Sequence, residues 1–147
     1  MCWPAILGRR QGCGAIHPPM ARILLIDDDR ALRNVVAKSL GYAGHEVIQA
    51  EDGLQGIELS RATTVDLVIT DLIMPVKEGV ETIILLCREH PNLPVIAISG
   101  GLSNSSTYLE IAAKIGARRV LPKPFTAQEL IALVKEVLGE AGASGAR

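Results

Sequence analysis

Short apolar runs alternate with longer amphipathic segments along most of the chain. Three of the five runs are almost entirely apolar, as expected for strands that are buried on both faces of a parallel sheet. In the segments between them, apolar residues recur at intervals of three and four, which is typical of helices that pack on such a sheet. The pattern therefore predicts an α/β fold in which five strands alternate with five helices. The expected strands are residues 22–26, 46–50, 66–70, 94–99 and 119–121.

Polar and small residues mark the predicted ends of several helices. Asp29 precedes the first helical stripe and is expected to be its N-cap. Thr126 and Glu129 have the spacing of a capping box at the start of the last helix. Gly41 and Gly139 follow the apolar stripes of the first and last helices, so we expect these helices to end there.

The two terminal segments differ in character from the rest of the chain. Residues 1–19 show neither helical nor strand periodicity and contain three Pro and three Gly. The residues after Leu138 are small and polar, which is typical of a flexible end. The sequence therefore predicts a folded domain over 20–139, an N-terminal extension over 1–19 that is not part of the fold, and a flexible C-terminal tail over 140–147.

Composition and charge narrow the class of protein. With 48% hydrophobic but only 3% aromatic residues, the core must be built from Leu, Ile, Val and Ala. A net charge of −1 argues against binding nucleic acid or a membrane surface through an excess of basic residues. No apolar stretch approaches the roughly 18 residues of a membrane helix. The three cysteines show no CxxC spacing, so we expect a reduced, cytoplasmic protein.

Chemically capable side chains are found at the ends of four of the five expected strands. They are Asp27 and Asp28 after the first, Asp71 after the third, Ser99 at the end of the fourth and Lys123 after the fifth. In open parallel sheets, ligands bind beyond the carboxyl ends of the strands, where the strand order reverses. If the second strand lies outside the first and the third lies inside it, Asp27 and Asp28 face Asp71.

Three converging carboxylates repel one another unless a cation lies among them. Mg²⁺ suits such a place, because it prefers oxygen ligands and is typically held by one or two carboxylates, water and a phosphoryl oxygen. Lys123 adds a positive charge and Ser99 a hydroxyl donor, both of which suit a phosphoryl group. The strand ends therefore predict a Mg²⁺ site that handles a phosphoryl group.

Four segments carry these side chains: MARILLIDDD, VDLVITDLIMPVKEG, VIAISGG and LPKPFT. Together they resemble the signatures of the receiver domains of two-component response regulators, in the same order and at similar spacing. The resemblance covers residues 20–139. It implies a doubly wound, flavodoxin-like (βα)5 fold with a five-stranded parallel sheet of order 2-1-3-4-5 and helices on both faces.

The resemblance also implies a separate role for each acidic residue. Asp71 is the phosphoacceptor, whose carboxylate attacks the phosphorus of a phosphohistidine. Asp28 is a direct ligand of Mg²⁺ or Mn²⁺, together with Asp71 and the main-chain carbonyl of Ile73. Asp27 is a further metal-binding residue that acts mainly through metal-bound water.

Two further side chains bind the phosphoryl group by the same resemblance. Lys123 pairs with the phosphoryl oxygens, and Ser99 moves to donate a hydrogen bond to them after transfer. The peptide bond between Lys123 and Pro124 is expected to be cis.

As a member of that family the chain would be a signalling domain and not an enzyme. A histidine kinase or a histidine phosphotransfer protein would donate the phosphoryl group. Phosphorylation would change the surface of the fourth helix, the fifth strand and the fifth helix, and with it the affinity for a partner. That partner would be a downstream effector protein, an output domain missing from this chain, or a second copy in a phosphorylation-dependent homodimer.

Three other functions stay open. A degenerate receiver would keep the fold without the chemistry, although this chain has every residue of the expected site. A constitutive scaffold or dimerisation module would use the same surface whether or not it is phosphorylated. An aspartate-nucleophile phosphatase requires a second Asp two residues after the nucleophile, and this chain has Ile73 there.

Overall fold

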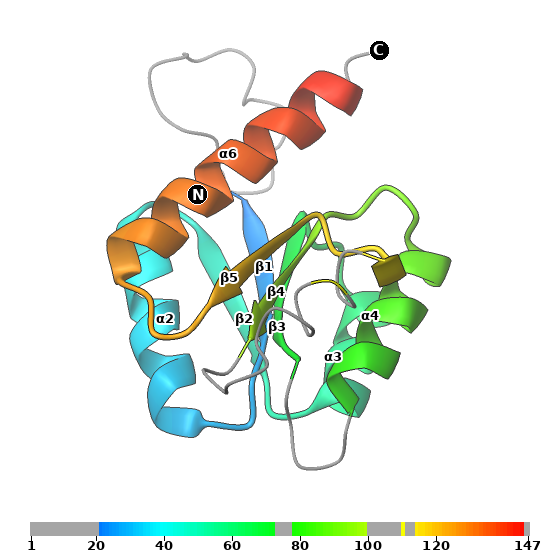
Figure 1. The fold of residues 1–147 in the computed structure, drawn as a ribbon, viewed down its shortest axis with the longest axis horizontal. Coiled ribbons are helices and arrows are strands. Elements are labelled where there is room, and N and C mark those ends of the chain that lie inside the picture. The colour runs from blue at the N-terminus through cyan, green and yellow to red at the C-terminus, as the bar shows by residue number, and fades with distance from the viewer. Residues whose placement is uncertain (1–20, 73–77, 100–109, 111–113, 146–147) are drawn as a thin grey trace.

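Five parallel strands form one sheet in the order β2-β1-β3-β4-β5 (Figure 1). The computed structural model describes residues 21–72, 78–99, 110 and 114–145. The strands are β1 (Arg22–Ile26), β2 (Glu46–Ala50), β3 (Leu67–Asp71), β4 (Val95–Ser99) and β5 (Arg119–Pro122). The helices are α2 (Arg30–Tyr42), α3 (Gly53–Ala62), α4 (Glu78–Glu89) and α6 (Ala127–Gly145). The predicted doubly wound fold and strand order are confirmed, and most of the helix expected between β4 and β5 falls outside the described residues.

Helices cover both faces of the sheet because side chains along each strand alternate between two hydrophobic cores. In β1, Ile23 and Leu25 pack against α2 and α6, whereas Leu24 and Ile26 pack in the core of α3 and α4. The central strand β3 is buried along its whole length. Because the core on each face is aliphatic, the low aromatic content of the chain is sufficient for a two-sided fold.

The register of the sheet sets the level at which the functional residues leave their strands. Ile26 of β1 pairs with Thr70 of β3, so the next residues, Asp27 and Asp71, lie side by side. The strand order reverses between β1 and β3, since β2 lies on one side of β1 and β3 on the other. Open parallel sheets bind ligands at such a reversal point, beyond the carboxyl ends of the strands.

The predicted N-caps are confirmed. The Asp29 side chain accepts a hydrogen bond from the Leu32 N–H at 3.1 Å, at the start of α2. At the start of α6 the Glu129 N–H donates to Thr126 Oγ1 at 3.0 Å, and the Thr126 N–H donates to Glu129 Oε1 at 2.9 Å. These bonds satisfy main-chain donors that the first helical turn leaves unpaired.

Removal of the α6 cap gives the first testable prediction. Thr126→Ala deletes the hydroxyl that accepts from Glu129, so we expect the free energy of unfolding to fall by about 1 kcal/mol. Urea denaturation measures this change. Thr64→Ala removes the same side chain at an exposed position between α3 and β3 and should stay within about 0.5 kcal/mol of the parent. Equal effects of the two substitutions would contradict the prediction.

The predicted C-terminal ends of two helices are wrong. Gly41 lies inside α2, which ends at Tyr42. The turn falls instead at Gly44, whose φ of 100° is in the left-handed region that favours glycine. The N–H of Gly44 donates to the Gly41 carbonyl at 3.0 Å and the N–H of His45 donates to the Leu40 carbonyl at 3.1 Å, which is the Schellman arrangement.

Gly139 is likewise inside its helix. α6 continues to Gly145 through the residues EAGASG, although each interior glycine costs roughly 1 kcal/mol and only Glu140, Ala141 and Ala143 are strong helix formers. Residues 140–145, expected as part of a flexible tail, are therefore helical. The predicted domain limits, 20–139 between 1–19 and 140–147, stay a prediction. Among the described residues, no helix is both long enough and apolar enough to span a bilayer.

Candidate functional site

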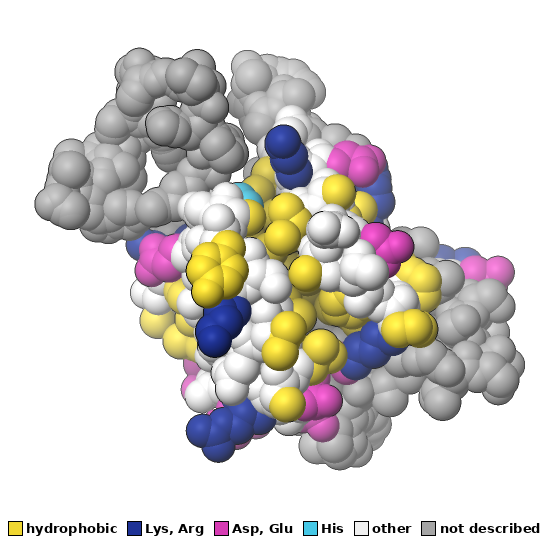
Figure 2. Space-filling model, turned by 90° about the vertical axis from the view of Figure 1, so that its left-hand side faces the viewer, with side chains coloured by type: hydrophobic (Ala, Val, Ile, Leu, Met, Phe, Trp, Pro, Cys, Tyr) yellow, Lys and Arg dark blue, Asp and Glu magenta, His cyan; other side chains and the backbone are white. Residues whose placement is uncertain are grey.

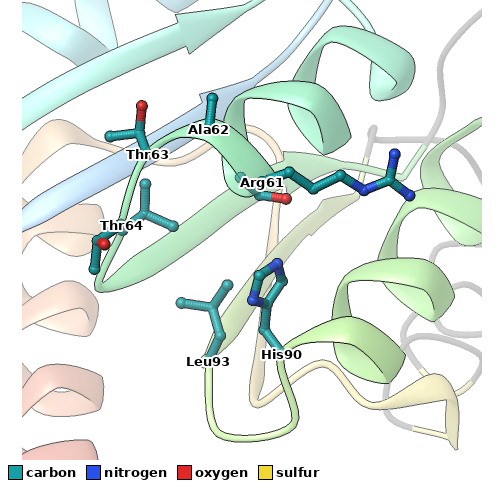
Figure 3. A pocket seen from close by; sticks show the side chains of 8 residues that line it. Arg61, Ala62, Thr63, Thr64, His90 and Leu93 are labelled. Carbon is teal, nitrogen blue, oxygen red and sulfur yellow. The ribbon is translucent and has the colours of Figure 1, made fainter.

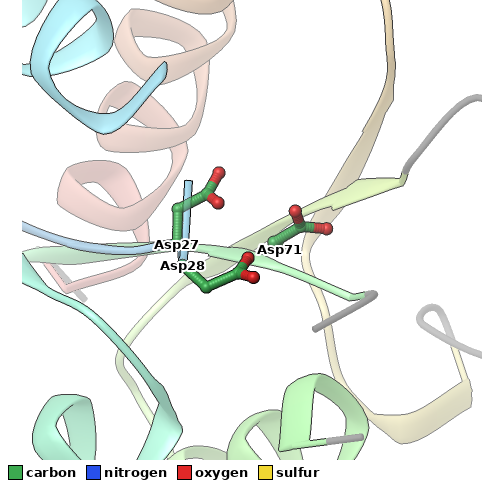
Figure 4. A group of neighbouring side chains, drawn as sticks. All are labelled: Asp27, Asp28 and Asp71. Carbon is green, nitrogen blue, oxygen red and sulfur yellow. The ribbon is translucent and has the colours of Figure 1, made fainter. Parts of the chain in front are cut away.

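Three carboxylates meet at the carboxyl ends of β1 and β3 (Figure 4). We call Asp27, Asp28 and Asp71 the acidic cluster; one oxygen from each lies within 4.8 Å of the others. Asp27 and Asp71 are 2% and 4% exposed, whereas Asp28 is open to solvent. The sequence prediction that these three residues converge is confirmed.

Lys123, which directly follows β5, also contacts this cluster. Its Nζ donates to Asp71 Oδ2 at 3.0 Å, and its side chain is half-buried. Burial alone would lower the pKa of Lys123, but the hydrogen bond and negative charge of Asp71, with the charges of Asp27 and Asp29, raise it. The lysine is thus charged at neutral pH. The Lys123–Pro124 peptide bond is cis, as predicted.

The electrostatic balance of the cluster favours a further cation. The pKa of Asp27 is raised to about 6, mainly by burial and further by the charges of Asp71 and Asp28. The hydrogen bond from the Asp29 N–H and the charge of Lys123 oppose this shift. One ammonium group therefore does not balance three carboxylates. The donor atoms are all hard oxygens, and the exposed Asp28 leaves room for water, so the site fits the requirements of Mg²⁺.

Of the two other predicted site residues, the structure describes only the main chain of Ser99. Ser99 ends β4 and pairs with Pro122, which precedes Lys123, so its main chain lies at the same edge of the sheet. Its side chain is outside the described structure. Ile73 also lies outside the described residues, and the metal-ligand role of its carbonyl stays a prediction.

One residue next to the cluster was not predicted from the sequence. Arg33 of α2 is buried, and its Nη1 donates to the main-chain carbonyl of Asp27 at 2.6 Å. The signal was present in the helical pattern, because Arg33 lies on the same buried stripe as Val36 and Leu40. A charged residue on an apolar stripe requires a buried partner, but the sequence does not say which one.

A cavity of about 430 Å³ adjoins Lys123 on the side of the molecule that carries α2. Leu32, Pro124 and Phe125 line it together with Lys123. Figure 2 shows this side, where hydrophobic side chains lie along the middle and charged side chains of both signs lie around them. Val35 and Tyr42 of α2 are large hydrophobic residues that remain exposed, 60% and 86% respectively. The cavity adjoins the acidic cluster through Lys123, which lines it and donates to Asp71.

A second cavity, of about 290 Å³, lies at the opposite end of the strands (Figure 3). It is formed by the end of α3, the segment that leads into β3, and His90 and Leu93. His90 follows α4, and its N–H donates to the Leu86 carbonyl at 2.8 Å, so it ends the helix as its position before Pro91 suggests. This cavity contains none of the predicted site residues.

Comparison with known proteins identifies the same fold. A family model described as the response regulator receiver domain matches residues 23–135. The transcriptional regulatory protein CpxR of Escherichia coli (strain K12) is 37% identical over 119 residues, which are 81% of this chain and 50% of that protein. The response regulator MprA of Mycobacterium sp. (strain KMS) is 35% identical over 117 residues, 80% of this chain and 50% of that protein.

Solved structures give the same result. A CheY-like receiver domain protein from Methanospirillum hungatei JF-1 has a TM-score of 0.78 at 26% identity, covering 85% of this chain and 98% of that one. The receiver domain of NtrX from Brucella abortus has a TM-score of 0.74 at 30% identity, covering 80% and 98%. The chain spans about half the length of the curated relatives it matches. The resemblance seen in its sequence is confirmed, and the chain belongs to the receiver domain family of two-component response regulators.

Proposed function

We propose that this receiver domain is a phosphorylation-dependent switch in which Asp71 accepts a phosphoryl group in a Mg²⁺-dependent reaction. One observation carries the proposal: Lys123 Nζ lies 3.0 Å from Asp71 Oδ2, beside two further carboxylates. A buried carboxylate with an ammonium group at hydrogen-bond distance can act as a nucleophile toward an anionic group that would otherwise be repelled. The donor is a histidine kinase or a histidine phosphotransfer protein.

In the transfer step, a carboxylate oxygen of Asp71 forms a bond to phosphorus while the P–N bond of the phosphohistidine breaks. The electron pair of that bond returns to the imidazole of the donor. Lys123 offsets the charge of the incoming phosphoryl oxygens, and Ser99 donates a hydrogen bond to them. Asp27, Asp28, Asp71 and the Ile73 carbonyl would hold Mg²⁺, or Mn²⁺ in its place, which supplies charge neutralisation during transfer.

The position of Lys123 suggests how the signal leaves the site. Lys123 lies between the end of β5 at Pro122 and the start of α6 at Ala127. A phosphoryl group on Asp71 would exchange the Lys123–Asp71 ion pair for a pair with phosphoryl oxygens, and so would act on both elements. We infer that the responding surface comprises β5, α6 and the helix expected between β4 and β5. It would bind a downstream effector protein, an output domain or a second copy of the chain.

Mg²⁺ binding to the unphosphorylated protein should depend on Asp28. Asp28→Asn removes one charge and one hard ligand, so we expect the Mg²⁺ affinity to fall at least tenfold in an NMR titration. Asp66→Asn makes the same charge change just before β3, at the opposite end of that strand from Asp71, and should leave the Mg²⁺ affinity within about twofold. Unchanged binding in Asp28→Asn would show that the ligand assignment is wrong.

Lys123 should govern the rate of phosphorylation. Lys123→Ala leaves the charge of the phosphoryl oxygens without its ammonium partner, so we expect acetyl phosphate to modify Asp71 roughly tenfold to hundredfold more slowly. Intact-mass spectrometry over time gives the rate. Lys135→Ala removes an exposed lysine from α6 and should match the parent. A parent-like rate in Lys123→Ala would contradict the role given to this residue.

A further inference from the structure

Arg33 is a buried charge that the proposed reaction does not use. Among the described residues, the charged side chains that are buried are Asp27, Asp71 and Arg33. The first two are members of the acidic cluster, whereas Arg33 is in the first turns of α2, on the stripe that packs toward the sheet. Burying a guanidinium group is costly unless its donors are paired, so its partners indicate what it does.

The guanidinium of Arg33 joins two neighbouring strands to α2. Its Nη1 donates to the Asp27 carbonyl at 2.6 Å, a buried contact, and its Nε donates to Gln49 Oε1 of β2 at 3.0 Å. The N–H of Arg33 itself donates to the Asp29 carbonyl at 2.9 Å. Arg33 therefore contacts the turn between β1 and α2 through both its side chain and its main chain.

With the contact from Arg33, hydrogen bonds hold both the main chain and the side chain of Asp27. The Asp27 N–H donates to the Ala50 carbonyl at 3.1 Å, and Asp27 Oδ1 accepts from the Asp29 N–H at 2.9 Å. The Asp27 carbonyl lies where β1 has already left the sheet ladder, and it accepts from Arg33. The main-chain direction at this point sets where the carboxylates of Asp27 and Asp28 are directed.

We propose that Arg33 is a positioning residue of the acidic cluster: by holding the Asp27 carbonyl, it orients the β1–α2 turn so that Asp27 and Asp28 converge with Asp71 on a divalent cation. Arg33 contacts the main chain and not the carboxylates, so it acts through geometry. The cation-binding part of this inference rests on the proposed function. Loss of a residue that orients metal ligands typically costs about 10–100-fold in metal affinity.

The decisive experiment compares Mg²⁺ affinity among folded variants of the unphosphorylated protein, by NMR titration. Arg33→Met keeps the apolar stem but removes both donors, and we expect affinity to fall about tenfold or more. Arg33→Gln is too short to reach the Asp27 carbonyl and should show the same loss; it decides the matter if the methionine variant does not fold. Arg33→Lys can still donate to that carbonyl and should recover most of the affinity.

Two controls separate positioning from a general effect on stability. Gln49→Leu removes only the partner of Nε, so its affinity should stay within about threefold of the parent. Arg61→Met removes an arginine that pairs with Glu89 at the distant end of α3, and should leave Mg²⁺ affinity unchanged even if stability falls. Parent-like Mg²⁺ affinity in folded Arg33→Met or Arg33→Gln would overturn the inference, because a purely structural role changes unfolding but not affinity.

A metal-free measurement distinguishes failure of this inference from failure of the proposed function. If Arg33 orients the turn, the Asp29 N–H, which donates to Asp27 Oδ1, should exchange with solvent at least tenfold faster in Arg33→Met without Mg²⁺. Amides of β4 serve as the reference for global opening. A parent protein that binds no Mg²⁺ would sink the proposed function, whereas an unchanged Asp29 exchange rate would sink the positioning role by itself.

Discussion

Replacement of Asp71 with Asn is expected to abolish phosphorylation of this protein by acetyl phosphate. The amide keeps the shape of the side chain at the end of β3, where residue 71 pairs with Ile98, but it cannot form an acyl phosphate. The parent should gain one alkali-labile phosphoryl group in intact-mass spectrometry, and the variant none. Because the asparagine side chain has nearly the same shape as that of aspartate, the variant should remain folded.

The matched control is Asp66→Asn, which makes the same substitution near the start of β3 and should be phosphorylated like the parent. A phosphoryl group mapped to a serine, threonine or histidine would overturn the mechanism. The same pair of proteins also tests the scaffold alternative. If a partner binds phosphorylated parent and untreated Asp71→Asn equally well, the domain acts constitutively and not as a switch.

Gly56→Ala is expected to destabilise the fold although it adds only one methyl group. Gly56 lies in α3 where the helix crosses close to β1, and a Cβ there would lie 2.8 Å from Cγ1 of Ile26 and nearer still to its Cδ1. Ile26 is fully buried, so it cannot move aside freely. Overpacking of about 1–3 kcal/mol should exceed the roughly 0.5–1 kcal/mol gained in helix propensity. We expect a net loss of about 1–2 kcal/mol in urea denaturation.

Gly41→Ala is the matched control for this substitution. Gly41 is also helical, but an added Cβ would meet nothing within 4 Å, so Gly41→Ala should stabilise the protein by about 0.5–1 kcal/mol. In an Ile26→Val background the nearest atom, Cδ1, is gone, and the penalty of Gly56→Ala should shrink. Stabilisation by Gly56→Ala in the parent would show that α3 is not held against β1 as described.

Most of the fold could be predicted from the sequence because a two-sided parallel sheet leaves a strong periodic signal. The limits of β1 and β2 were predicted to the residue, whereas β3 was placed one residue early. Asp71 was expected directly after the strand. It is instead buried in the ladder beside Ile98, where Lys123 stabilises its charge.

The sequence predicted those long-range contacts that follow from topology, but not those that depend on the reach of individual side chains. The convergence of the acidic cluster followed from the rule for strand ends, because that rule depends only on topology. The role of Arg33 depends on which carbonyl happens to lie within its reach, and that of Gly56 depends on how closely α3 approaches Ile26. The C-terminal ends of α2 and α6 were misjudged because interior glycines are tolerated wherever packing or neighbouring helix formers compensate.

The acidic cluster makes this edge of the sheet a source of instability in the metal-free fold. Three carboxylates lie within 4.8 Å of one another, two of them buried, with one lysine against them. A neutral side chain at position 27 or 28 would relieve repulsion and leave the Lys123–Asp71 ion pair intact, so a chain selected for stability alone would not keep all three carboxylates. On the function proposed above, the site preserves a repulsion that folding must overcome, and a cation bound there would return part of that free energy as ligand-linked stability.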